Sequence, residues 1–145
     1  MLATIALALA APAAVAAEIR QVGAKPVVDR MARAGTWDAA IAAMGRGERR
    51  WIALAPLLAP GTDAGTAEDL GIALAQGLPR APDAVLRVAT AGDGPLALDR
   101  ICSVPFIEPT PAFVRRYLRS ARDAVSQVRA PALAAQRSRC LARLR

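Results

Sequence analysis

The sequence predicts a small all-α protein, and three observations support this fold class. Alanine, the strongest helix former, is frequent, and strand-forming residues never alternate with polar residues as they do in strands. Apolar residues recur at helical spacing, most clearly in the last third of the chain. Only five aromatic side chains are available for a core: Trp37, Trp51, Phe106, Phe113 and Tyr117. We therefore expect closely packed helices around a few large side chains.

The first seventeen residues have the pattern of a secretory signal peptide. They carry no charged side chain, include the apolar run Leu2 to Ala10 and end in small residues before Glu18. The run is shorter than the roughly 20 apolar residues that span a bilayer. We expect cleavage after Ala17 and one mature domain over residues 18–145, in the periplasm or outside the cell. No Lys or Arg precedes the run, so a buried N-terminal helix or an uncleaved anchor is the alternative.

Glycine and proline divide the first two thirds of this domain into short helices. The predicted helices span residues 27–34, 37–44, 48–58, 67–76, 82–88 and 98–103. Pro56 is expected to kink or shorten the third of these. Thr66 and Asp69 have the spacing of a capping box, which would start the fourth. A repeat of helix–turn–helix units stays open as an alternative, without a signature spacing to support it.

A proline-rich strap is predicted over residues 105–111. Its three prolines push the residues before them towards extended backbone, so the segment cannot be helical throughout. Phe106 and Ile107 are expected to pack down on the core.

A long amphipathic helix and a final helix follow the strap. Thr110 is placed to cap the first, with Pro111 in its first turn. Its apolar seam comprises Val114, Leu118, Ala121, Val125 and Val128. Pro131 interrupts the chain, and the final helix is expected from Ala132 towards Leu144.

Cys102 and Cys140 are the only cysteines. Behind an export signal, an even number of cysteines most often forms disulfides, and two cysteines allow one intramolecular connectivity. Closing so long a loop is worth roughly 4 kcal/mol in the chain-entropy model. The wide separation gives neither sulfur a nearby resolving partner, which argues against a thiol–disulfide active site. We therefore predict a structural disulfide.

The net positive charge is concentrated at the C-terminal end. Residues 111–145 hold nine arginines and one acid, whereas residues 18–110 hold ten basic and eleven acidic residues. Five arginines of the long helix form the candidate binding surface: Arg115, Arg116, Arg119, Arg122 and Arg129. We predict that they bind an acidic protein or an anionic envelope component, while export argues against nucleic acid. The alternative is a solvated basic face, partly neutralised by Asp63, Glu68, Asp69 or Asp83.

Histidine and asparagine are absent from the chain. Without histidine, Ser-His-Asp and Cys-His catalytic arrangements and histidine-ligated metal sites are excluded. The acidic group Asp63, Glu68 and Asp69 lacks the spacing of an EF-hand, and acids at a helix start are expected from capping. No phosphate-binding loop is present. We therefore predict no catalytic, cofactor-binding or metal-binding residues.

These observations predict an exported, non-catalytic binding protein that acts through its arginine-rich C-terminal face. One alternative is a hydrolase of the glycan-cleaving type that uses carboxylates alone. It would need two carboxylates facing each other across a cleft, drawn from Asp63, Glu68, Asp69, Asp99 and Glu108. A purely structural envelope protein is the other alternative.

Overall fold

A computed structural model describes residues 11–145, and over this range the fold is all-α, as predicted. The helices are α1 (Pro12–Val22), α2 (Ala24–Ala34), α3 (Thr36–Gly45), α4 (Arg49–Ile52), α5 (Ala55–Leu58), α6 (Ala64–Gly77), α7 (Pro82–Val88), α8 (Leu98–Ile101), α9 (Pro111–Ser126) and α10 (Ala134–Arg143), with the 3₁₀ turns η1 (Ala59–Gly61) and η2 (Pro131–Leu133). Within residues 11–145 no strand forms, and a single bridge pairs Thr90 with Ala97. The predicted leader's apolar run, Leu2 to Ala10, lies outside the described residues.

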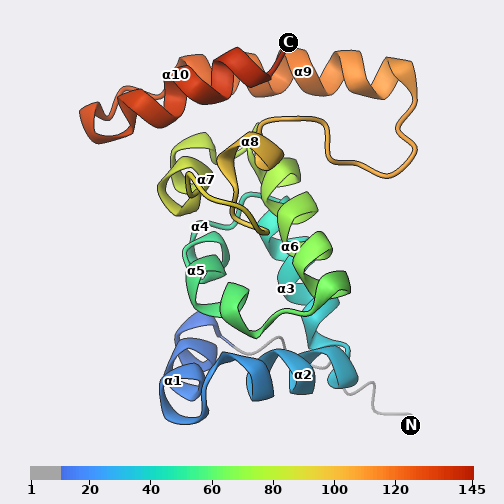
Figure 1. The fold of residues 1–145 in the computed structure, drawn as a ribbon, viewed down its shortest axis with the longest axis vertical. Coiled ribbons are helices and arrows are strands. Elements are labelled where there is room, and N and C mark those ends of the chain that lie inside the picture. Colours follow the sequence, from blue (N-terminus) through green and yellow to red (C-terminus); the bar gives the residue numbers. More distant parts are fainter. Residues whose placement is uncertain (1–10) are drawn as a thin grey trace, which may run out of the picture.

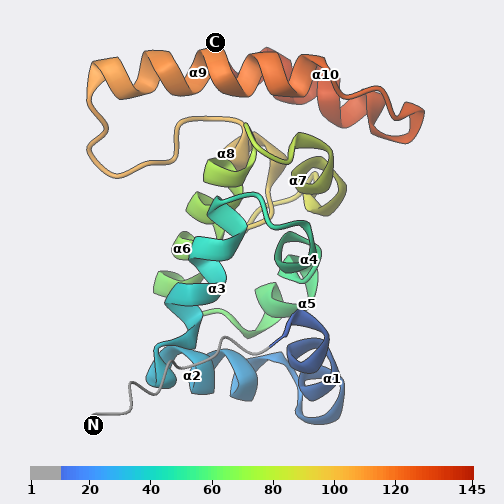
Figure 2. The ribbon, with the colours of Figure 1, turned by 180° about the vertical axis from the view of Figure 1, so that it is seen from behind.

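The helices are stacked along one long axis. Figure 1 shows α1 and α2 at one end, α3 and α6 side by side in the middle, and α9 with α10 across the opposite end. Figure 2 shows the same arrangement from behind, with α4 and α5 beside the α3–α6 pair. One apolar core runs through this stack from α1 to α10. The C-terminal helix pair therefore forms a layer that covers one end of the core.

The α3–α6 pair is close because small residues face each other across it. A Cβ atom added at Gly77 would lie 2.5 Å from the carbonyl oxygen of Met44. Ala40, Ala43 and Ala73 are fully buried in the same region of the core. Alanine buries little apolar area itself, but its small side chain lets the helix backbones approach and form many dispersion contacts.

The start of α6 differs from the sequence prediction, whereas the break at Pro56 agrees with it. The capping box at the start of α6 uses Asp63 and Thr66, so the predicted Thr66–Asp69 box is wrong. The extended backbone of Asp63 lets its carboxylate accept a hydrogen bond from the Thr66 amide at 2.9 Å, and the helix begins at Ala64. Pro56 shortens the predicted 48–58 helix as expected, because the chain divides there into α4 and α5.

Residues 103–110 form no helix and connect α8 to α9. Phe106 packs against the core, whereas Ile107 is 73% exposed, so the prediction that both pack down is wrong. The chain bends at residues 107 and 108, where Glu108 has a φ of 45°, so the strap is not extended throughout and Ile107 projects into solvent at the bend. Thr110 caps α9 as predicted, with its hydroxyl oxygen accepting a hydrogen bond from the Phe113 amide at 3.2 Å.

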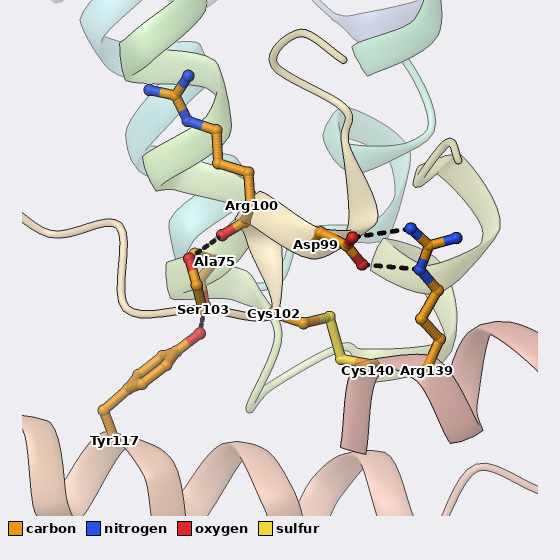
Figure 3. The surroundings of a disulfide bond; sticks show 8 residues. All are labelled: Ala75, Asp99, Arg100, Cys102, Ser103, Tyr117, Arg139 and Cys140. Carbon is orange, nitrogen blue, oxygen red and sulfur yellow. Dashed lines mark hydrogen bonds and ion pairs between the residues drawn. A yellow bond between two sulfur atoms is a disulfide. The ribbon is translucent and has the colours of Figure 1, made fainter. Parts of the chain in front are cut away.

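The predicted disulfide is present and joins the end of α8 to α10. Cys102 and Cys140 are fully buried, with 5.2 Å between their Cα atoms. Beside it, Arg139 of α10 donates two hydrogen bonds of 2.7 Å to the carboxylate of Asp99 on α8 (Figure 3). The covalent bond and the ion pair therefore connect the same two helices at neighbouring positions.

Helix α1 includes the bond at which cleavage is predicted. Val15 and Ile19 of this helix are buried against α2 and α5. Cleavage after Ala17 would remove Val15 from the core and leave the last turns of α1, with Glu18 hydrogen-bonded to Arg30. With cleavage, the core loses Val15; without cleavage, the whole of α1 stays packed against α2 and α5.

We expect Gly77→Ala to lower the free energy of unfolding by about 1–3 kcal/mol, because the added methyl group would overpack the α3–α6 contact. Helix propensity alone predicts the opposite sign. Gly65→Ala in the same helix is the matched control, since its Cβ would meet its nearest atom at 3.7 Å. Urea denaturation measures both variants. Equal stability of the two would contradict the close-contact account.

Candidate functional site

Helix α9 buries one side and presents arginines on the other. Tyr117, Ala121, Val125 and Val128 are buried, while Val114 and Leu118 of the predicted seam are only half-buried. The opposite side carries three exposed arginines, Arg115, Arg119 and Arg122. Arg129 is also exposed but follows the end of α9 at Ser126, so the prediction that it lies on the long helix is wrong. We call these four residues together the arginine face. Since residues three, four and seven apart share one side of a helix, this spacing places Arg115, Arg119 and Arg122 on one side of α9.

The described carboxylates leave the arginine face unneutralised. None of its four members forms an ion pair with a carboxylate of residues 11–145, and Arg122 donates a hydrogen bond to the carbonyl of Leu144. The acids that were expected to compensate the charge are mostly engaged at other positions. Asp63 caps α6, Asp69 accepts a hydrogen bond from the Trp37 indole, and Asp83 accepts two from Arg49. The positive charge of the face therefore points into solvent.

The Arg49–Asp83 pair illustrates how those acids are held. Arg49 donates hydrogen bonds of 2.7 and 2.8 Å to the carboxylate, and these bonds hold the pKa of Asp83 below its usual range. For Asp63, the bonds from Thr66 lower the pKa in the same way. These hydrogen bonds stabilise both carboxylates in their ionised form, so neither depends on an arginine of α9.

An aromatic cluster lies between the strap and α9. The ring of Phe106 makes edge-to-face contacts with Phe113 and Tyr117, at centroid distances of 5.2 and 4.8 Å. Phe113 and Tyr117 stack one turn apart on α9. Such pairs are the preferred arrangements of aromatic rings and stabilise beyond the area that they bury. The cluster therefore fixes the strap against the N-terminal half of α9.

Tyr117 anchors this cluster to the middle of the molecule. Its hydroxyl donates a hydrogen bond of 2.7 Å to the carbonyl oxygen of Ala75 on α6 (Figure 3). Burial raises the pKa of Tyr117 well above its ordinary value, so the hydroxyl keeps its proton over the physiological range. This bond ties the α9 layer to the α3–α6 pair.

Two adjoining hollows run along the aromatic cluster. Their volumes are about 680 and 510 Å³, and both are lined by Gln76, Phe106, Phe113 and Arg116. We call them together the strap groove. The larger hollow is also lined by Arg46 and Arg80, and no Asp or Glu lines either one. Arg116 thus differs from the arginine face, because it borders this groove.

Sequence reasoning did not identify the strap groove. The spacing of Phe113 and Tyr117 is the one available signal, because residues four apart meet on a helix. Arg46 follows α3 and Arg80 follows α6, and the sequence contains nothing that brings them next to Arg116. Their proximity is a product of helix packing.

The arrangement of acids gives little support to carboxylate chemistry. A hollow of about 570 Å³ is lined by Asp93 and Asp99, and Asp99 is held there by Arg139. That ion pair lowers the pKa of Asp99, whereas a general acid for glycan cleavage needs a raised pKa. Over residues 11–145 no group of three His, Cys, Asp or Glu side chains is placed to hold a metal ion.

None of the helices within residues 11–145 combines the length and the apolar character needed to cross a bilayer. Comparison of the chain with known protein families, with curated proteins and with solved structures finds no match.

We expect Tyr117→Phe to lower the free energy of unfolding by about 1 kcal/mol at neutral pH, through loss of the hydrogen bond to Ala75. Stability of the native protein should also fall as the pH rises above about 10, because unfolded tyrosine releases its proton there while folded Tyr117 keeps it. The Tyr117→Phe variant has no phenol to titrate, so it should not show this additional loss of stability.

Urea denaturation at pH 7, 9 and 11 measures both effects. Tyr117 is the only tyrosine, so the difference between the two proteins isolates its contribution. Parallel losses of stability between pH 9 and 11 would show that burial does not raise this pKa.

Proposed function

We propose that this protein is an exported, non-catalytic binding protein whose arginine face holds an anionic partner in the cell envelope. The observation that carries the proposal is the row of Arg115, Arg119, Arg122 and Arg129, exposed and without a carboxylate partner among residues 11–145. A guanidinium group binds carboxylate or phosphate through two parallel hydrogen bonds, which suits recognition of acidic proteins or anionic envelope components. The charges lie in solvent, so binding should weaken with salt.

The fold supports this function by fixing the backbone that carries the arginine face. Helix α9 is fixed to α6 through Tyr117, and α10 is fixed to α8 by the disulfide and by Arg139. Because the helix backbone is already held in place, binding has to order only the arginine side chains. The fixed backbone also keeps the positive side chains on one side of the C-terminal layer, where they can contact several anions of one partner.

Export is the second part of the proposal. The disulfide supports it, because such bonds persist in oxidising compartments and are rare in the cytosol. The uncharged leader with small residues before Glu18 supports it independently. Cleavage after Ala17 would leave a mature domain that begins with the last turns of α1.

We expect the triple variant Arg115→Gln, Arg119→Gln and Arg129→Gln to bind vesicles of an anionic phospholipid, or poly-glutamate, roughly a hundredfold more weakly at low salt. Each basic residue near an anionic surface contributes about 1 kcal/mol. Arg122 is left unchanged because it bonds to Leu144. The matched control removes three exposed arginines without an ion pair on other helices, with the same change in net charge: Arg20→Gln, Arg33→Gln and Arg50→Gln.

Co-sedimentation with vesicles and fluorescence titration with labelled poly-glutamate provide the measurements. Circular dichroism checks that both variants keep their helices. The proposal requires the face variant to lose binding and the control to retain most of it. If both variants lose binding equally, net charge alone determines binding and the arginine face has no special part. Unchanged binding in both would favour a structural envelope protein without a specific ligand.

For export, we expect the protein purified from its native compartment to begin at Glu18 and to have a mass two protons below that of the reduced form. Intact-mass spectrometry with and without reductant reports both properties in one experiment. Retention of Met1 together with α1 would contradict cleavage. Free thiols under non-reducing conditions would contradict residence in an oxidising compartment.

A further inference from the structure

The strap groove combines uncompensated positive charge with an apolar floor. Arg80 and Arg116 form no ion pair with a carboxylate of residues 11–145, and Arg46 is paired with Glu48. Arg80 donates a hydrogen bond to the backbone carbonyl of Gly45, and this uncharged acceptor does not neutralise its positive charge. With no Asp or Glu lining the groove, two guanidinium charges face a space that no described carboxylate enters.

The groove is also where apolar surface is left uncovered. Large exposed apolar side chains within residues 11–145 are Val22, Ile107 and Phe113, and the last two both line the strap groove. Ile107 is 73% exposed and Phe113 is 36% exposed, beside the partly buried ring of Phe106. A contiguous apolar patch bordered by charge is typical of an interaction surface, whereas an isolated exposed residue such as Val22 is ordinary.

Shape and polar groups favour an extended peptide as the occupant. The two hollows share Gln76, Phe106 and Phe113 in their linings, so one continues into the other, and both are open to solvent. An acyl chain in so open a groove would keep much of its surface in water. The exposed amide of Gln76 and the hydroxyls of Thr110 and Ser120 along the lining can bond to a peptide backbone.

We propose that the strap groove binds an extended acidic segment of a partner protein, with an aromatic or aliphatic side chain against Phe106, Phe113 and Ile107 and carboxylates at Arg80 and Arg116. This inference rests on the proposed function, because it assigns the anionic partner to the class of acidic proteins. The apolar side chains of the partner would bind at the strap, and the arginine face would contact further acidic residues of the same partner.

A fluorescein-labelled peptide of sequence Asp-Glu-Phe-Asp-Leu-Glu is a direct probe, with fluorescence anisotropy as the readout. One control peptide carries serine in place of Phe and Leu, and a second carries Asn and Gln in place of the acids. We expect the full-length protein to bind the probe at least tenfold more tightly than either control peptide, because the groove offers both charge and apolar contact.

Variants locate the binding site. We expect Ile107→Ser and Arg116→Gln each to weaken binding of the probe at least fivefold. Their matched controls are Val22→Ser and Arg33→Gln, exposed residues of α1 and α2 at the opposite end of the molecule (Figure 1). Both controls should bind as the native protein does. Thermal melting of each variant confirms folding, and Ile107 is so exposed that its replacement leaves the core intact.

Three results would overturn the inference. Equal binding of the probe and the serine peptide would show that the apolar floor takes no part. Loss of probe binding in the Arg115, Arg119 and Arg129 variant alone would move the peptide site to the arginine face and leave the proposed function standing. Displacement of the probe by anionic vesicles, with vesicle binding also weakened by Ile107→Ser, would assign the groove to a membrane surface.

Discussion

The Cys102–Cys140 disulfide is the constraint on which the C-terminal layer depends. Helix α10 buries only Cys140 among its own residues, with Leu133 and Leu144 flanking it. So little apolar burial would not hold a ten-residue helix in place, because isolated helices of this length are marginal in water. The bond fixes α10 to α8 and encloses α9 within its loop. This link and the Tyr117–Ala75 hydrogen bond together hold the layer that carries the arginine face and one wall of the strap groove.

Close approach of small side chains adds to the burial of large ones in the middle of the molecule. Between α3 and α6, glycine and alanine let the two backbones approach beside the buried Met44, Leu70 and Leu74, and Gly77 leaves no room for a methyl group. Dispersion contacts between the backbones therefore supplement the burial of apolar side chains. The few aromatic rings are then available at the edge, where Phe106, Phe113 and Tyr117 join the strap, α9 and α6.

Local sequence signals predicted the elements well, because caps, prolines and helical spacing act within a few residues. Thr110 starts α9 and Pro56 divides the 48–58 segment, as expected. The errors arose where two local signals competed. Asp63 and Thr66 were available as a second capping pair three residues upstream. In the strap, a bend at residues 107 and 108 leaves Ile107 exposed while Phe106 packs inwards.

The sequence by itself determined the all-α class, the single connectivity of the two cysteines, the exclusion of histidine chemistry and the charge of the last 35 residues. These properties depend on composition and short spacings. Only the tertiary structure decided which acids reach which arginines, and it pairs Asp83 with Arg49 and Asp99 with Arg139. It also brought Arg80 beside Arg116 to form the strap groove. Such neighbours are set by helix packing across the chain, which no local pattern encodes.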